Sequence, residues 1–265
     1  MGISFQPMAD NANRSDPISG RYFGSIEHAD SLSTGLFSFM ALFSILMLLV
    51  NKNLHPWWHD MLEYFFVLLV IFLFLAGLAT RLYLTPRAEE KRRQDFFSNA
   101  CNVSLIHERT VGYYNNNLAE PIERIAAQLL ENSLFSKNIS LKMAQFERKR
   151  LGLYFVCYLL AVFNRETDLE LIAVVSQVIF SEQILSRYIR LEWLRMKSEK
   201  TFNEVYRMFQ SKLAKEHFQV QTLDFLVDYE RTKATAGITL SSRLFEQMNP
   251  ALSREWECIK KKLTI

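Results

Sequence analysis

The sequence predicts an all-α integral membrane protein, with an N-terminal transmembrane helical hairpin, a second hydrophobic hairpin and a cytoplasmic helical domain that contains a long helix. Two observations support this fold class. No glycine or proline lies between Gly152 and Gly237, so nothing there forces a helix to end. The apolar residues also gather in separate blocks: Leu36–Val50, Met61–Leu84, Leu151–Phe163 and Leu169–Leu185.

The first two apolar runs are long enough to cross a membrane. With the less hydrophobic Ser31–Gly35 in front of it, the first run reaches the roughly 20 residues that about 30 Å of hydrocarbon requires. The second carries charge only near its ends, at Glu63 and Arg81. The loop NKNLHPWWHD between them is short. We therefore expect a polar segment over residues 1–30 and one membrane hairpin over residues 31–84.

Basic residues predict the orientation of this hairpin. The loop contains one of them, Lys52, whereas most lie on the flanks: Arg14, Arg21, Arg81, Arg87, Lys91, Arg92 and Arg93. Because lysine and arginine accumulate on the cytoplasmic side, we expect a multi-pass protein with both termini in the cytoplasm. The acidic residues before the first run argue against a cleaved secretory signal. The net charge of +3 is too small to predict binding of duplex nucleic acid.

Residues 85–148 are predicted to form a cytoplasmic sensor region with one amphipathic helix. Pro121 lies in the first turn of that helix, and apolar side chains then recur at helical spacing: Ile122, Ile125, Ala126, Leu129 and Leu130. A helix with such a face needs a partner surface.

The second hydrophobic hairpin, over residues 149–190, has two interpretations. A helix over Leu151–Phe163 rises only about 20 Å, and polar Gln177, Glu182 and Gln183 lie in the next block; both features favour a buried or re-entrant hairpin. Basic residues on both sides of the hairpin instead fit a second pair of spans: Arg148, Lys149, Arg150, Arg187, Arg190 and Arg195. The sequence leaves both interpretations open.

Residues 191–265 are predicted to form a cytoplasmic helical C-terminal region. A single helix is expected from about Asp168 to Phe218. It carries an imperfect apolar seam that favours a homo-oligomer over a monomeric bundle: Leu191, Leu194, Phe202, Val205, Phe209 and Leu213. After an extended piece at 237–240, Ser241 or Ser242 is expected to cap a helix that ends at Asn249-Pro250, before a last helix.

The motifs of common enzymes are missing, so the sequence does not predict an enzyme. There is no phosphate-binding glycine loop, GxSxG, HExxH or paired CxxC, and the three cysteines match no metal-ligand spacing. His55 and His59 flank two tryptophans, which favours anchoring at the membrane interface over a metal pair. No metal or cofactor is therefore expected.

Small polar residues on the first membrane helix form a loose stripe. Such a stripe is usually a helix-packing face, but in an oligomer it would line a conduit. Together with an acid at the outer end of the second helix, it supplies the pore or gate candidates: Thr34, Ser38, Ser44 and Glu63.

Two long stretches resemble the bacterial SMODS-associated four-transmembrane putative pore-forming effectors. One begins KRRQDFFSNA and runs through RTVGYYNNN to LLENSLFSKNIS (Lys91–Ser140), and the other is the tail DYERTKATAGITLSSRLFEQMNPALSREWECIKKKL. The resemblance implies an anti-phage effector of the cell inner membrane, encoded beside a nucleotidyltransferase and controlled by that enzyme's nucleotide product. Its ligand would be a nucleotide second messenger or an oligonucleotide, and its action would permeabilise the membrane.

A nucleotide sensor needs cations for phosphate, aromatic faces for bases and amides for base edges. Residues of these types lie on either side of the helix that begins at Pro121: Arg92, Arg93, His107, Arg109, Tyr113, Tyr114, Asn115, Asn116, Lys137 and Asn138. The alternative is a plain turn, because Gly112 before asparagines is turn chemistry and Asn117 with Glu120 can cap a helix.

Two functions of different classes follow. The first is a defence effector that forms a nucleotide-controlled pore or channel and stops growth. The alternative is a membrane-anchored scaffold or sensor whose hairpin only localises a helical domain that binds a partner protein. Leakage from liposomes separates the two.

Overall fold

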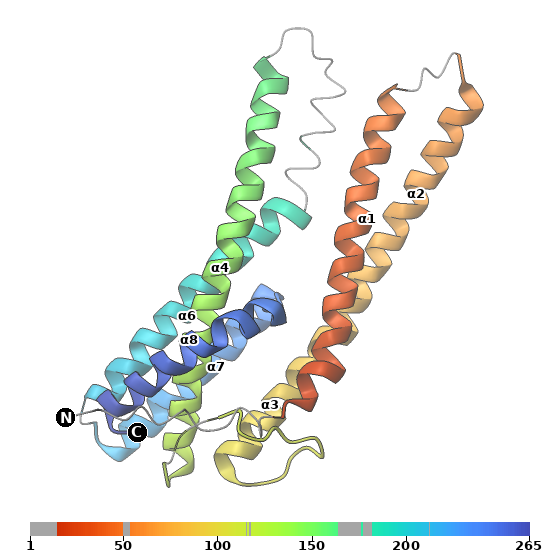
Figure 1. The fold of residues 1–265 in the computed structure, drawn as a ribbon. Helices are drawn as coiled ribbons and strands as arrows, with labels where there is room; N and C mark the ends of the chain where they lie inside the picture. The colour runs from red at the N-terminus through yellow and green to blue at the C-terminus, as the bar shows by residue number, and fades with distance from the viewer. Residues whose placement is uncertain are drawn as a thin grey trace, which may run out of the picture.

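The computed structural model describes residues 15–49, 54–114, 116, 118–163, 176, 182–211 and 213–265. Every regular element in these residues is a helix, which confirms the all-α prediction. Two long apolar helices stand beside a helical bundle, and one half of α4 extends beyond that bundle (Figure 1). Most of the Leu169–Leu185 block lies outside the described residues.

The first two long helices lie side by side as the predicted hairpin. A short π-helix, η2 (Ser19–Phe23), leads into α1 (Gly24–Leu49), and α2 (Pro56–Ala79) returns along it (Figure 1). The rings of Phe43 and Phe65 meet between them, with 5.1 Å between centroids. The second helix begins at Pro56, ahead of the predicted Met61, because proline suits the first turn of a helix.

One helix among the described residues is long and apolar enough to cross a membrane. It runs from Pro56 to Cys101 and joins α2, the π-helix η3 (Thr80–Leu84) and α3 (Thr85–Cys101). No residue in its apolar window is buried. Large apolar side chains are exposed all around α2, among them Phe65, Leu68, Ile71, Phe72, Phe74 and Leu75. A largely exposed helix that is apolar on every face has the length and composition of a membrane span.

A second long helix, α4 (Pro121–Phe163), joins the predicted amphipathic helix to the third apolar block without a break. Its first half begins at Pro121 and buries Ile125, Ala126, Leu129 and Leu130, as the spacing predicted. Its second half has the opposite character, because its large apolar side chains are exposed: Leu153, Phe155, Val156, Leu160, Val162 and Phe163. That half extends beyond the bundle in Figure 1.

The prediction of one helix through Phe218 is wrong. A π-helix, η4 (Glu182–Ser186), precedes α6 (Arg187–Gln210), and α7 (Lys215–Ala236) then packs back against α6. The chain turns through extended backbone at Ser211 (φ −85°, ψ 126°) and Ala214 (φ −61°, ψ 148°). These angles are open to any residue, so the turn needs neither glycine nor proline. The turn lets Leu226 and Tyr229 of α7 enter the core.

The apolar seam predicted for self-association is mostly used within the chain. Leu191, Leu194, Phe202 and Val205 are buried in the bundle, Phe209 packs partly buried against its core, and Leu213 is exposed. The predicted sensor and C-terminal regions share this core, which contains Phe96, Ala100, Ile125, Ala126, Leu129, Leu130, Leu134, Phe202, Val205, Met208, Leu226, Tyr229 and Trp256. The structure therefore supports the monomeric-bundle alternative for this seam.

The last helix, α8 (Ser242–Leu263), follows an extended segment and begins where predicted, with the Ser241 hydroxyl accepting from the Leu244 amide at 3.4 Å. The predicted break at Pro250 is wrong, since the helix continues through it. A proline removes one backbone hydrogen bond. Leu252 and Trp256 beyond it are buried, and their burial holds the helix in place.

Candidate functional site

A cavity of about 640 Å³ lies between the N-terminal segment, α3, α4, α7 and the start of α8. Its charged lining residues are Asp16, Glu89, Arg92, Lys233 and Glu246. Its aromatic lining residues are Phe23, Tyr113, Phe135, Tyr229 and Phe245. Amides and hydroxyls complete the wall: Ser19, Asn132, Ser136, Thr239, Ser242 and Asn249. The cavity thus combines the three residue types expected of a nucleotide sensor, contributed by segments far apart in the sequence.

Arg92 is the first of two cations in this wall. It donates a hydrogen bond to Asp16 at 2.9 Å, and its side chain is only 16% exposed. Its guanidinium carbon lies 4.8 Å from the ring centroid of Tyr113 and 5.3 Å from that of Phe23. Burial would lower the pKa of Arg92, but Tyr113 and Asp16 outweigh burial and raise it, so the group stays cationic. One of its terminal nitrogens, Nη1, is buried without a hydrogen-bond partner in the described part of the chain.

Lys233 is the second cation. Its ammonium lies 2.6 Å from Glu89 and 3.4 Å from Glu230. Burial would lower the pKa of Lys233, but the charges of these two carboxylates raise it well above its usual value. Beside it, the Tyr229 hydroxyl lies 2.7 Å from the Ser136 hydroxyl, and burial raises the pKa of Tyr229 to about 12. This side of the wall therefore holds one fixed positive charge and a neutral phenol at physiological pH.

The two cations are each paired with an acid of the same wall. An anion that enters the cavity therefore competes with Asp16 for Arg92 and with Glu89 for Lys233, and it gains the aromatic faces as a platform for a planar group. Charge-assisted hydrogen bonds are roughly twice as strong as neutral ones. The arrangement places two ion pairs beside aromatic faces in one cavity.

The turn before α4 carries Tyr113 to the cavity. The Asp95 carboxylate accepts hydrogen bonds from the Thr110 amide at 3.0 Å and from the Thr110 hydroxyl at 2.6 Å, both buried. Val111 exchanges backbone hydrogen bonds with Ser15, and Gly112 then adopts a positive φ of 64°, which glycine tolerates best. The segment is therefore a turn and also supplies a wall residue, so the two interpretations of GYYNNN are compatible.

Two of the predicted ligand residues, Arg92 and Tyr113, line the cavity, and the others that the structure describes do not. Tyr114 packs against the core, with its ring 5.7 Å from that of Phe96, and burial raises its pKa. Arg109 donates to the Ser98 carbonyl at 3.0 Å.

The remaining predicted ligand residues lie in other places. The Lys137 ammonium is 3.5 Å from the Phe202 ring centroid, and burial lowers its pKa. Asn138 donates to the Leu134 carbonyl of its own helix at 2.9 Å. Arg93 and His107 are exposed, Asn116 is half-buried, and none of these three lines the cavity. Asn115 lies outside the described residues.

The pore or gate candidates form no shared site in the single chain. The Thr34 hydroxyl donates to the Asp30 carbonyl and the Ser38 hydroxyl donates to the Thr34 carbonyl, each at 2.9 Å, so both bond to their own helix. Ser44 is half-buried, and the exposed Glu63 lies 4.0 Å from the imidazole of His59. Asp60 joins this pair to form a group with the geometry of possible metal ligands.

Sequence reasoning missed most of the wall. Asp16, Glu89 and Lys233 are ordinary charged residues in their local sequence, and no motif distinguishes them. Their roles come from contacts across the fold: Arg92 with Asp16 and Lys233 with Glu89. A local pattern carries no signal for such pairs.

The cavity wall is connected to the base of α1. The Ser242 amide, at the start of α8, donates to the Glu27 carboxylate of α1 at 2.8 Å. Arg187 of α6 also lies between acids of two other helices, 3.2 Å from Asp30 of α1 and 3.7 Å from Glu147 of α4. The α8 part of the cavity wall and helix α6 therefore both contact α1, the first through a backbone amide and the second through an ion pair.

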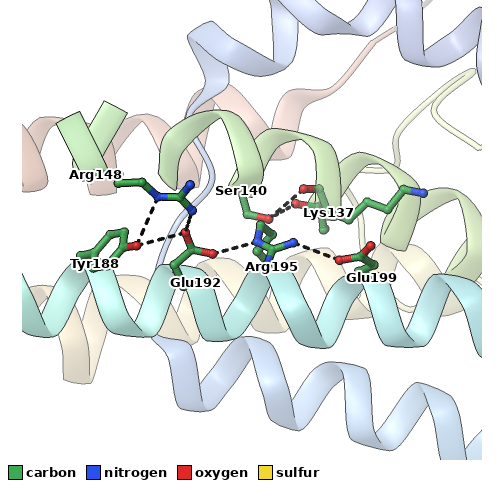
Figure 2. Close-up of polar contacts among 8 residues, drawn as sticks. Lys137, Ser140, Arg148, Tyr188, Glu192, Arg195 and Glu199 are labelled. Carbon is green, nitrogen blue, oxygen red and sulfur yellow. Dashed lines mark hydrogen bonds and ion pairs between the residues drawn. The ribbon is translucent and has the colours of Figure 1, made fainter. Parts of the chain in front are cut away.

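A polar network joins α4 and α6 near the point where α4 leaves the bundle. Figure 2 shows Glu192 at its centre: Arg148 and Tyr188 contact one of its oxygens, and Arg195 donates to the other at 2.8 Å. Arg195 also donates to Glu199 at 3.0 Å. Burial would raise the pKa of Glu192, but the hydrogen bonds from Arg195 and Arg148 lower it overall. The network fixes the two helices to each other.

The stretch Lys91–Ser140 contains six of the wall residues, and the family assignment stays a prediction: Arg92, Tyr113, Asn132, Phe135, Ser136 and Ile139. The chain has no significant match among protein-family models, curated proteins or solved structures.

Proposed function

We propose that the protein is a bacterial anti-phage defence effector that forms a nucleotide-controlled pore or channel in the inner membrane, with both termini in the cytoplasm. The observation that carries the membrane part is α2, which exposes apolar side chains on all faces beside a polar bundle. The defence role and the nucleotide ligand rest on the resemblance of Lys91–Ser140 to four-transmembrane effectors. The ligand would bind the cavity that contains Arg92 and Tyr113.

The exposed half of α4 supports a second pair of spans. Leu153, Leu160 and Phe163 are 63%, 68% and 78% exposed, so no part of the described chain covers them. If this hairpin were buried in the protein, other parts of the chain would have to cover these side chains. Arg148 and Lys149 are exposed just before this half, where cytoplasmic residues of a span accumulate positive charge. Figure 1 shows this half rising on the same side of the bundle as α1 and α2.

Control by a ligand requires that the ligand prefer one state of the protein. A nucleotide phosphate that binds Arg92 displaces Asp16, which lies just before η2 and α1. Its base would stack on the wall rings, an interaction of about 1–3 kcal/mol per base. Because Glu27 of α1 accepts from the Ser242 amide in the wall, these changes shift the membrane helices toward one state. A preference of about 5.5 kcal/mol reverses a 1:99 equilibrium.

The proposal is tested by dye or ion flux from liposomes that contain the purified full chain, with and without short oligonucleotides. We expect flux that changes at least tenfold in one ligand condition. The matched control is Arg92→Gln, which removes the cation and keeps a polar side chain. Liposomes that stay intact under every ligand condition would favour the alternative, a membrane-anchored scaffold that binds a partner protein.

A further inference from the structure

Helix α7 has an apolar stripe that its own bundle leaves uncovered. Val220, Leu223 and Val227 are 68%, 48% and 64% exposed. At 100° per residue, these positions lie within about 60° of one another on the helix. The buried residues of α7 lie on the opposite face: Thr222, Leu226, Tyr229, Thr232 and Ala236. The stripe is therefore the outer face of an amphipathic helix whose inner face already packs in the core.

The charges at the ends of the stripe identify what covers it. Glu216 precedes Val220 by four residues, and Arg231 follows Val227 by four residues, on the same face. Both are exposed, and neither has an ion-pair partner among the residues that the structure describes. Along this face the order is acid, valine, valine, base. An identical helix that runs in the opposite direction therefore places a base opposite each acid and a valine opposite each valine. A partner with this complementarity is a second α7 in the antiparallel direction.

We propose that two copies of the chain associate through an antiparallel α7–α7 contact with a two-fold axis beside Leu223. Val220 of each copy then packs on Val227 of the other, and the two Leu223 side chains meet at the axis. Glu216 of each copy lies opposite Arg231 of the other. Asp224, 100° around the helix from Leu223, stays at the solvated rim.

This contact replaces the seam that the sequence placed over Leu191–Leu213, most of whose apolar residues are buried inside the chain. It is isologous, so one contact closes a dimer. It does not depend on the proposed pore or its ligand, because the contact residues lie outside the cavity lining. A protein without ligand response can still form the dimer, and the assays below measure association alone.

Disulfide formation tests the direction of the contact. In the full chain in nanodiscs, with Cys101, Cys157 and Cys258 changed to serine, we expect Val220→Cys combined with Val227→Cys to give a disulfide-linked dimer. Each single variant should form it at least tenfold more slowly, because equivalent positions then lie about 10 Å apart along the axis, beyond the 7 Å reach of a disulfide. The control is Gln221→Cys combined with Val227→Cys, since Gln221 is exposed but lies at least 100° around the helix from each residue of the stripe.

Charge exchange tests the pairing. Glu216→Arg or Arg231→Glu alone should raise the dimer dissociation constant roughly tenfold, because two like-charged pairs replace two exposed ion pairs. The combination of both should restore it. No linked dimer from the Val220→Cys and Val227→Cys chain, equal linking in the Gln221→Cys control, or failure of the combined charge variant to restore association would each overturn the proposal.

Discussion

The guanidinium of Arg92 lies over the ring of Tyr113, 4.8 Å from the ring centroid, whereas the ring of the next residue, Tyr114, lies 5.7 Å from that of Phe96 in the core. Adjacent tyrosines of one turn therefore have different surroundings. Tyr113 lines the cavity, and Tyr114 packs against the hydrophobic core. The turn therefore contributes one ring to the cavity wall and one ring to the core.

Replacing each tyrosine in turn tests this assignment. Tyr113→Ala should weaken binding of a short oligonucleotide about tenfold, because the loss of one stacking face costs about 1–3 kcal/mol, with little change in stability. Tyr114→Ala should lower the free energy of unfolding by about 3 kcal/mol, as for other large core side chains, and leave the affinity of the folded protein unchanged. Calorimetric titration and urea unfolding measure the two effects. Loss of stability alone in both variants would make the segment a turn only.

Asp16 competes with any anionic ligand for Arg92, since the two side chains lie 2.9 Å apart. Asp16→Asn removes the competing charge but keeps the size of the side chain. We expect binding of an oligonucleotide, and of inorganic pyrophosphate as a simple anion, to become about tenfold tighter, because a hydrogen bond to a charged group contributes about 1.5–3 kcal/mol. Calorimetry measures the affinity.

The control for this prediction is Glu246→Gln, which also neutralises a wall carboxylate but one that has no ion pair with Arg92 among the described contacts. An equal gain in affinity for both variants would show that the overall negative charge of the cavity, and not the specific contact between Asp16 and Arg92, opposes the ligand. Weaker binding in the Asp16→Asn variant would show that Asp16 orients Arg92 for the ligand.

The sequence predicted the elements whose signals are local. Pro121 begins a helix, Ser241 caps one, and the apolar run after Pro56 forms a long exposed helix. The end of α6 at Gln210 was missed because the turn that follows uses extended backbone at Ser211, which leaves no mark in composition. The continuation of α8 through Pro250 was missed because burial of Trp256, a tertiary effect, outweighs a local helix breaker.

The same distinction holds for the cavity. Arg92 and Tyr113 were identifiable because they lie near the turn that has the right residue types. Lys233 was not, since its pairing with Glu89 joins α7 to α3 across the bundle. Lys137 and Asn138 were chosen for residue type, but the helix directs them to Phe202 and to the Leu134 carbonyl. Residue type alone does not give the direction of a side chain.

Glu192 makes the stability of the α4–α6 junction depend on pH. Hydrogen bonds from Arg195 and Arg148 lower its pKa in the folded protein below the ordinary value of 4.5, despite burial. A lowered carboxylate pKa stabilises the fold above the unfolded pKa, and this stabilisation is lost as the pH falls through the folded pKa. Urea midpoints should therefore fall less steeply between pH 5 and pH 3 in Glu192→Gln than in the wild-type chain.

A matched control for acid sensitivity is Asp224→Asn, which changes an exposed carboxylate of α7 that has no ion-pair partner among the described residues. We expect its midpoints to follow the wild-type curve. If Glu192→Gln kept the full acid dependence, the network of Figure 2 would not link protonation to the contact between α4 and α6.

Glu27 of α1 contacts the α8 part of the cavity wall, because its carboxylate accepts from the Ser242 amide at 2.8 Å. The contact places a negative charge at the N-terminus of α8, where a helix favours an acid. Glu27→Gln keeps an acceptor without the charge, and Glu27→Ala removes both. If the contact transmits ligand binding to the membrane, oligonucleotide affinity should stay within about twofold, while ligand-dependent flux from liposomes should fall in the order wild type, Gln, Ala. An equal fall in affinity and flux would instead place Glu27 in the binding site. Unchanged flux in the alanine variant would remove this contact from the pathway. Arg187, which contacts both Asp30 and Glu147, would then be the connection between bundle and hairpin.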